Sequence, residues 1–207
     1  MRSDKSRPHS TSAKRHKPKI GNPTPLGLSA FALSVMVSAL YNLKLFGITQ
    51  SNVMIGVSLF TGGVVQFASG MWEFKVGNTF GGTGFSAFGG FWASYGTILH
   101  YFADNVDSDQ YHNTMGTFCS AWLMFTFIFT LACIRTNLGV LSAFVFLTIT
   151  FILEVIYHFT VVNIFIKLAG VSGMLTCTAV WYCLGATLLT PDLSPISLPL
   201  YDLSHKD

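Results

Sequence analysis

Six long runs of apolar residues limit the folds that this chain can adopt. A helix needs about 20 mostly apolar residues to cross a lipid bilayer. Such runs cover residues 26–46, 52–74, 80–102, 114–134, 138–159 and 164–189. Only 10% of the residues are charged, against roughly 25% in an ordinary soluble domain. The sequence therefore predicts an all-α membrane protein with six transmembrane helices per protomer.

The N-terminal segment differs sharply from the apolar body. Seven of the twelve Lys and Arg residues lie in the first twenty positions: Arg2, Lys5, Arg7, Lys14, Arg15, Lys17 and Lys19. A run of like charges is usually a solvated tail, and beside a membrane it lies on anionic headgroups at the cytoplasmic side. We expect a disordered cytoplasmic tail over residues 1–20, a transmembrane domain over 21–190 and a short cytoplasmic tail over 191–207. Lipid is an expected partner, and nucleic acid is not.

The loop charges predict an orientation. Lys75 and Arg135 lie in connections that would be on the same side as the basic tail. The connection at 104–109 holds three acids and no Lys or Arg, so it should face outward. Six spans then return the C-terminus to the cytoplasm, and the plasma membrane is the expected location.

Motifs for hydrolysis, nucleotide binding or metal catalysis do not occur in the sequence. The histidines outside the tail lie far apart, and the four cysteines lack the paired spacing of a zinc or redox site. These residues are His100, His112 and His158, with Cys119, Cys133, Cys177 and Cys183. We predict no catalytic residues, no metal site and no cofactor, and we interpret the cysteines as packing residues.

One ionisable residue stands inside the fifth apolar run. Glu154 precedes His158 by four positions, which places both on one helix face. An ionisable residue at membrane depth is a functional candidate, so this pair is a candidate for proton coupling. The alternative is that Glu154 faces a helix contact or a wet space and only pairs with His158. Glu73 and Lys75 flank the end of the second run and are interpreted as interfacial anchors.

Two irregular segments interrupt the apolar pattern. Residues 22–28 place two prolines before the first helix, where Asn22 can serve as a cap. Residues 77–83 open the third helix with Asn, Thr and Gly. Free backbone N–H groups there could hold a small anion, and a capped helix start is the alternative. Glycines at 62–63, 70, 81–82 and 89–90 predict close packing of the second and third helices.

Together these segments carry a resemblance to a known family. Asn22-Pro23-Thr24-Pro25-Leu26-Gly27-Leu28 is its first signature, and the second runs from Glu73 through Gly77-Asn78-Thr79-Phe80-Gly81-Gly82-Thr83 to Phe88-Gly89-Gly90-Phe91-Trp92. The chain resembles the acetate uptake transporters, also described as succinate–acetate permeases, over roughly residues 21–190. The long basic tail is similar to that of fungal members. The motif residues are Asn22, Pro23, Pro25, Leu26, Gly27, Gly81 and Gly82.

The resemblance implies a homohexamer in which each protomer carries acetate or a similar small carboxylate through its own pathway. It places an apolar constriction at Phe31, Phe88 and Leu147, where the second position is often Tyr in the family. Donors to the carboxylate would be Gln66, Asn78, Thr79 and Thr83. Channel and proton symport both stay open. Alternative functions are ammonium or ammonia export, and a transport-inactive membrane sensor of the same fold.

Overall fold

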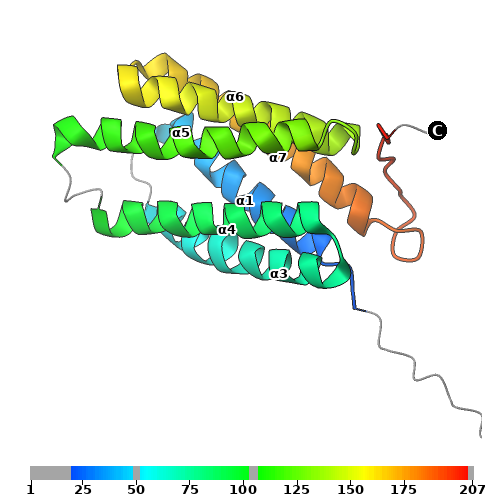
Figure 1. Ribbon diagram of the computed structural model, residues 1–207. Coiled ribbons are helices and arrows are strands. Elements are labelled where there is room, and N and C mark those ends of the chain that lie inside the picture. Colours follow the sequence, from blue (N-terminus) through cyan, green and yellow to red (C-terminus); the bar gives the residue numbers. More distant parts are fainter. Residues whose placement is uncertain (1–19, 49–51, 103–106, 205–207) are drawn as a thin grey trace, which may run out of the picture.

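Six long helices lie side by side in the computed structural model, which describes residues 20–48, 52–102 and 107–204 (Figure 1). Three shorter elements, α2 (Asn52–Gly56), the π-helix η2 (Val57–Val65) and α3 (Gln66–Val76), follow one another as a single continuous helix. The other elements, in chain order, are α1 (Thr24–Asn42), the short turn η1 (Leu45–Gly47), α4 (Thr79–Thr97) with its extension η3 (Ile98–Phe102), α5 (Ser108–Ala132), α6 (Leu138–Thr160) and α7 (Asn163–Leu188). The predicted all-α fold with six helices is confirmed.

Most of the helix bounds agree with the apolar runs. Two ends differ from the expectation. The first run was drawn to residue 46, but α1 ends at Asn42, and Lys44 and Phe46 take left-handed conformations with φ of 52° and 57°. The fourth helix begins at Ser108, earlier than residue 114, because polar residues form its first turns. Much of the basic tail and part of the acidic connection, residues 1–19 and 103–106, lie outside the described residues.

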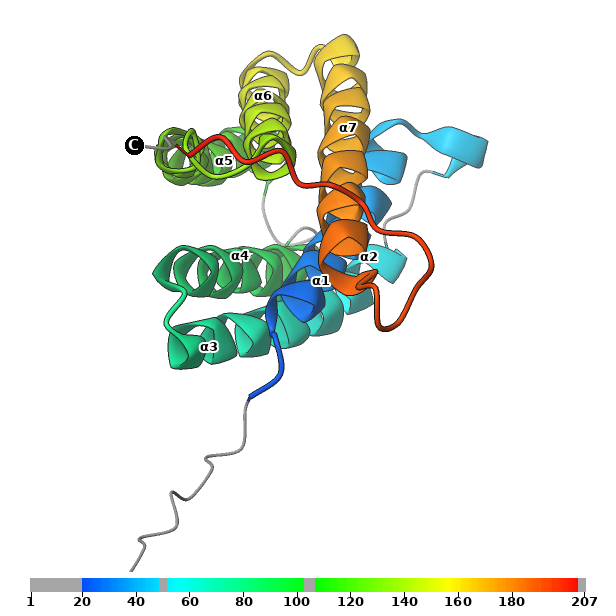
Figure 2. The ribbon, with the colours of Figure 1, turned by 90° about the vertical axis from the view of Figure 1, so that its right-hand side faces the viewer.

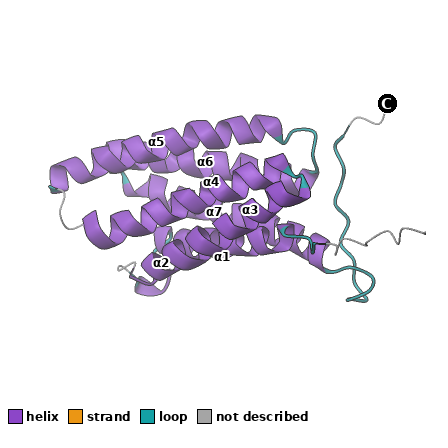
Figure 3. Ribbon diagram, turned by 60° about the horizontal axis from the view of Figure 1, so that its bottom comes forward, coloured by secondary structure: helices purple, strands orange, loops and turns teal. Residues whose placement is uncertain are grey.

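Length and composition make the chain a multi-pass membrane protein. Within the described ranges, five helices are long and apolar enough to cross a bilayer, over 24–42, 52–76, 110–132, 138–160 and 163–188. The sixth, α4, is also 19 residues long but less apolar, because six of those residues are glycine. It completes the bundle between helices that do meet the criterion (Figure 3).

Two groups of helices are joined through α1. On one side of the molecule, η2 and α3 pack against α4; on the other, α7 packs against α6 and α6 against α5. Helix α1 contacts both α7 and the η2–α3 helix (Figure 2). Aromatic side chains fill much of the space between α4 and α5, including the stacked rings of Phe88 and Trp122, whose centroids are 6.0 Å apart. The two groups therefore enclose a region lined mainly by rings.

Glycines explain how closely α4 approaches the η2–α3 helix. Gly62 lies against Trp92, Gly70 against Ser86 and Gly82 against Phe74, so the contacts run antiparallel along both helices. Small residues let backbones approach in lipid, where van der Waals packing drives helix association. The predicted role in packing is confirmed for these three glycines, whereas Gly90 of the predicted set has nothing within 4 Å of an added Cβ.

Two adjacent glycines of α4 provide a matched test of this packing. A Cβ on Gly89 would lie 2.8 Å from Cβ and 2.9 Å from the backbone N of Phe67, whereas a Cβ on Gly90 meets nothing within 4 Å. We expect Gly89→Ala to lower the free energy of unfolding in micelles by about 1–3 kcal/mol, because backbone atoms would have to move. Gly90→Ala should leave stability equal or slightly higher, by up to about 1 kcal/mol. Equal loss in both variants would contradict the assignment.

Candidate functional site

Two cavities lie one above the other between α1, α4, α6 and α7. The first has a volume of about 260 Å³ and opens near the start of α1. The second, about 40 Å³, lies toward the end of α1. Its volume exceeds the 10–15 Å³ or so that one water requires. Residues lining the first cavity include Thr24, Leu28, Asn78, Phe80, Phe85, Thr136, Asn137, Val140, Phe144, Val180, Cys183, Thr187 and Leu200. Those of the second include Val35, Ser38, Asn42, Phe91, Trp92, Thr150, Phe151, Glu154 and Ala169.

Three side chains line both cavities: Phe31, Phe88 and Leu147. They are the residues that the family resemblance assigned to the constriction. All three are buried, with 8%, 3% and 5% of their surface exposed. The rings of Phe31 and Phe88 meet edge to face with centroids 5.3 Å apart. An apolar layer from α1, α4 and α6 thus stands between the two cavities.

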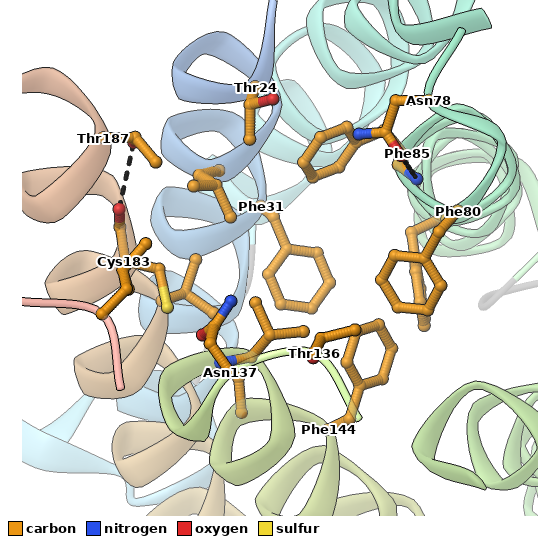
Figure 4. Close-up of a pocket in the computed structure, with 18 of the residues that line it drawn as sticks. Thr24, Phe31, Asn78, Phe80, Phe85, Thr136, Asn137, Phe144, Cys183 and Thr187 are labelled. Carbon is orange, nitrogen blue, oxygen red and sulfur yellow. Dashed lines mark hydrogen bonds between the residues drawn. The ribbon is translucent and has the colours of Figure 1, made fainter. Parts of the chain in front are cut away.

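The surroundings of Phe88 hold this layer in place. On α5, Trp122 stacks on the Phe88 ring, and Phe125 meets it edge to face at 5.5 Å. Within the first cavity, Phe31, Phe80, Phe85 and Phe144 surround the open space (Figure 4). Such offset and edge-to-face contacts favour defined ring positions, so the layer is a packed structure with few free rotamers.

Hydroxyls and amides supply the polar surface of the first cavity. Thr24, Asn78, Thr136, Asn137 and Thr187 contribute these groups, and no described residue lining the cavity is charged. A cavity of this kind can solvate a carboxylate with donors that release it again, and it offers apolar rings to a methyl group.

A buried carboxylate organises the entrance. Glu73 of α3 is 1% exposed, so the interpretation of this residue as an interfacial anchor is wrong. Its Oε1 accepts a hydrogen bond from Thr24 Oγ1 at 2.5 Å, and its Oε2 accepts one from Asn78 Nδ2 at 2.7 Å. Glu73 therefore joins the start of α1 to the start of α4, and both of its partners line the first cavity.

Both irregular segments form helix starts with side-chain caps. Helix α3 ends in a Schellman motif, in which Asn78 N–H donates to Glu73 O and Gly77 takes the left-handed conformation with φ of 89°. The Asn78 side chain then caps α4 by accepting from Gly81 N–H at 3.0 Å. Asn22 Oδ1 accepts from Thr24 N–H at 3.1 Å, as expected of a cap. The structure thus favours the capped start over an anion site on backbone N–H groups.

The motif residues serve packing as well as capping. Pro23 precedes α1 and Pro25 lies in its first turn, where a missing N–H costs nothing. A Cβ on Gly27 would lie 2.5 Å from the Phe85 ring, so this glycine lets α1 approach α4. Gly81 and Gly82 are buried against Asn78 and Phe74, respectively, while Leu26 is 48% exposed.

Only one of the four predicted polar donors, Asn78, lines a cavity. Gln66 is fully buried, and neither its Nε2 nor its Oε1 has a hydrogen-bond partner in the described part of the chain. Thr79 is exposed and Thr83 is half-buried, and neither is among the residues lining the two cavities. Both follow the capped turn on sides of α4 that do not meet the first cavity.

Glu154 and His158 have different partners. Glu154 lines the second cavity, and its Oε1 accepts a hydrogen bond from Asn42 Nδ2 of α1 at 3.1 Å. His158 instead faces His112 of α5, with their Nδ1 atoms 3.3 Å apart. The expectation that the histidines lie apart is wrong for this pair. No group of three His, Cys, Asp or Glu side chains suited to a metal occurs among the described residues.

Comparison with known proteins gives a consistent group of relatives. The model of the GPR1/FUN34/yaaH family matches residues 5–205. Ammonia transport outward protein 2 of Saccharomyces cerevisiae is 34% identical over 194 residues, which are 91% of this chain and 69% of that protein. Acetate permease A of Emericella nidulans is 35% identical over 179 residues, covering 79% of this chain and 60% of that protein.

Bacterial relatives are similar over more of their own length. The succinate-acetate/proton symporter SatP of Escherichia coli K12 is 28% identical over 171 residues, or 82% of this chain and 90% of that protein. The solved structure of the bacterial acetate channel SatP superposes with a TM-score of 0.80 at 26% identity, covering 88% of this chain and 99% of that one.

The role of Glu73 can be tested against Lys75, an exposed residue of the same helix. Glu73→Ala would remove the acceptor for Thr24 and Asn78, so we expect the free energy of unfolding to fall by about 1–3 kcal/mol. Amide exchange at Gly81 and Gly82 should also accelerate, because the cap loses its support. Lys75→Ala should change neither quantity. Unaltered exchange in Glu73→Ala would show that the carboxylate does not hold the entrance.

Proposed function

We propose that this chain, which belongs to the GPR1/FUN34/yaaH family, carries acetate and related short monocarboxylates across a membrane. The chain spans 60% of the length of acetate permease A, so the activity named for that relative is inferred for this chain. The observation that carries the proposal is the arrangement of two cavities separated by Phe31, Phe88 and Leu147. These three residues form the constriction of the pathway.

The lining suits an ion with one apolar and one charged end. Phe31, Phe88 and Leu147 would contact the methyl group and exclude bulk water. On the first-cavity side, the hydroxyl of Thr24 and the amide of Asn78 would bind the carboxylate. On the other side, Asn42 and Thr150 offer similar groups. Because a hydroxyl is absent from the Phe88 ring, the constriction favours acetate over hydroxylated acids.

Crossing the apolar layer favours a neutral species. Removing a carboxylate from water without a compensating partner is costly, so acetate would cross together with a proton. Glu154, which faces the second cavity beside Asn42, is the group placed to exchange that proton. His158 lies one helical turn after Glu154 and contacts His112. It would take part in the proton exchange between Glu154 and the extracellular end of the bundle.

The wider setting follows from the same reasoning. We place both termini in the cytoplasm and the protein in the plasma membrane, with residues 1–20 on anionic lipid and no enzymatic activity. Large apolar side chains on η2, α3 and α5 face outward: Phe60, Val64, Phe67, Met71, Met124, Phe127, Ile128 and Leu131. They would contact lipid or neighbouring protomers of a homohexamer.

Ammonium export is the second candidate function. Glu154 favours it, because a carboxylate in the second cavity attracts a small cation. Labelled acetate uptake into proteoliposomes separates the two functions and also tests a transport-inactive sensor. Acetate flux above that of empty vesicles supports the proposal. Flux of ammonium without flux of acetate would instead support ammonium export. The absence of both fluxes would favour a transport-inactive sensor.

The constriction predicts the effect of removing a ring. Phe31→Ala or Phe88→Ala should widen the layer, so the uptake rate of butyrate or hexanoate relative to acetate should rise by about tenfold or more. Phe60→Ala is the control, because this ring is 68% exposed on the outer surface. Unchanged selectivity in both constriction variants would place the narrow point elsewhere.

Glu154 predicts a pH profile. An ionised Glu154 repels acetate, and a protonated one does not, so uptake should fall as the pH rises and Glu154 loses its proton. Glu154→Gln can neither repel acetate nor exchange a proton, so its uptake should lose the dependence on pH that this residue causes. The pH is kept equal on both sides of the vesicle membrane. The uptake of empty vesicles, which measures passive diffusion of acetic acid, is subtracted. His100→Gln is the control outside the cavities, and identical profiles for Glu154→Gln and the unmodified protein would exclude the role.

A further inference from the structure

The segment after α7 crosses the end of the bundle at which the first cavity opens. Residues 189–204 leave α7 and run past the ends of α7 and α6 (Figure 2). The Tyr182 hydroxyl donates to Pro199 O at 2.7 Å. Further on, Leu138 N–H donates to Tyr201 O at 2.9 Å, and Leu203 N–H donates to Thr136 O at 3.0 Å. The segment is thus attached to the turn between α5 and α6.

Its attachment puts one side chain into the wall of the first cavity. Leu200 lines this cavity, as do Thr136 and Asn137 of the turn that holds the segment. All other lining residues belong to helices α1, α4, α6 and α7 or to the turns at their starts. Leu200 is therefore the contribution of the C-terminal segment to the proposed pathway.

The restraint on this segment is light compared with that on the helices. It forms an antiparallel bridge between Asn137 and Asp202, and its side chains are largely exposed, as in Leu193 at 78%, Tyr201 at 62% and Leu200 at 37%. A helix in the wall can move only if its packed contacts rearrange. The segment can move by breaking the Tyr182–Pro199 hydrogen bond and the two backbone hydrogen bonds to the turn, without rearranging a packed helix.

We infer that residues 189–204 form a movable wall of the first cavity, and that Leu200 on this wall limits the size of carboxylate that enters from this end. The inference rests on the proposed function, because it assigns a gate and a size filter to that pathway. Opening means release of the Asn137–Asp202 bridge. Closure returns Leu200 to the cavity between α6 and α7.

The bridge offers a covalent lock. Asn137 and Asp202 form a non-hydrogen-bonded antiparallel pair, since the hydrogen bonds join the residues on either side. Such pairs have Cα atoms about 4.5 Å apart, within the range that a disulfide spans. Asn137→Cys combined with Asp202→Cys, in a Cys183→Ser background that removes the native thiol of this cavity, should form a disulfide on oxidation.

Acetate uptake of this variant is measured in proteoliposomes before oxidation, after oxidation and after reduction. Oxidation should reduce uptake to the level of empty vesicles, and reduction should restore it. Because all three measurements use the same variant, the loss of the Asn137 cap affects them equally. If the disulfide is verified by mass spectrometry and uptake is unchanged, the movable wall is excluded. If the unmodified protein and the reduced variant both fail to take up acetate, the proposed function fails instead.

Leu200 provides a second, independent test that does not depend on the disulfide. Leu200→Ala should raise the uptake of hexanoate relative to acetate by about tenfold, because the wall loses its apolar side chain. Leu193→Ala, in an exposed part of the same segment, should leave the ratio unchanged. Equal ratios for both variants, with acetate uptake intact, would overturn the assignment of Leu200.

Discussion

The geometry of the whole pathway depends on one buried carboxylate. Glu73 binds Thr24 at the start of α1 and Asn78 at the start of α4, so it fixes the two helices relative to each other at one end. From these points, Phe31 lies seven residues along α1 and Phe88 ten residues along α4, rises of about 10 Å and 15 Å. Their rings meet edge to face between the two helices, with centroids 5.3 Å apart. The buried carboxyl group is tolerated because Thr24 and Asn78 donate hydrogen bonds to its two oxygens.

The distribution of polarity follows from this frame. Glycines bring α4 against the η2–α3 helix, which leaves its aromatic side free to face α5 and α6. The first cavity is wide and uncharged, whereas the second is narrow and holds Glu154. An anion that enters the first cavity would therefore meet amides and hydroxyls, and then the aromatic rings of the constriction. Beyond them it would meet Glu154, which repels an anion only when it is ionised. The low content of charged residues in the chain therefore has two causes: most of the helix surface faces lipid, and the first cavity is lined by uncharged groups.

The sequence predicted what depends on local pattern. Apolar length located the six helices, and the family motifs identified Phe31, Phe88 and Leu147, which the structure brings together from three helices. Side-chain direction was harder to predict, because it depends on the neighbours of each helix: Thr79 and Thr83 belong to the motif of Asn78 but point elsewhere. Glu73 looked like an interfacial residue, although its place five residues before Asn78, across the Gly77 turn, is a signal for the Schellman link. Contacts such as His112 with His158, or Leu200 with α6, join distant segments and have no local signature.

The central claim is that acetate travels between α1, α4, α6 and α7 through the apolar layer. Crystals of the full chain soaked in bromodifluoroacetate test it most directly, because its two fluorines suppress displacement of bromide by thiols such as Cys183, and anomalous scattering locates bromine without reference to the protein density. The account predicts a bromine peak in the first cavity, on the face formed by Phe31, Phe88 and Leu147, and loss of that peak when excess acetate competes. Peaks confined to the outer surface or to the space between protomers, with the first cavity empty, would contradict it.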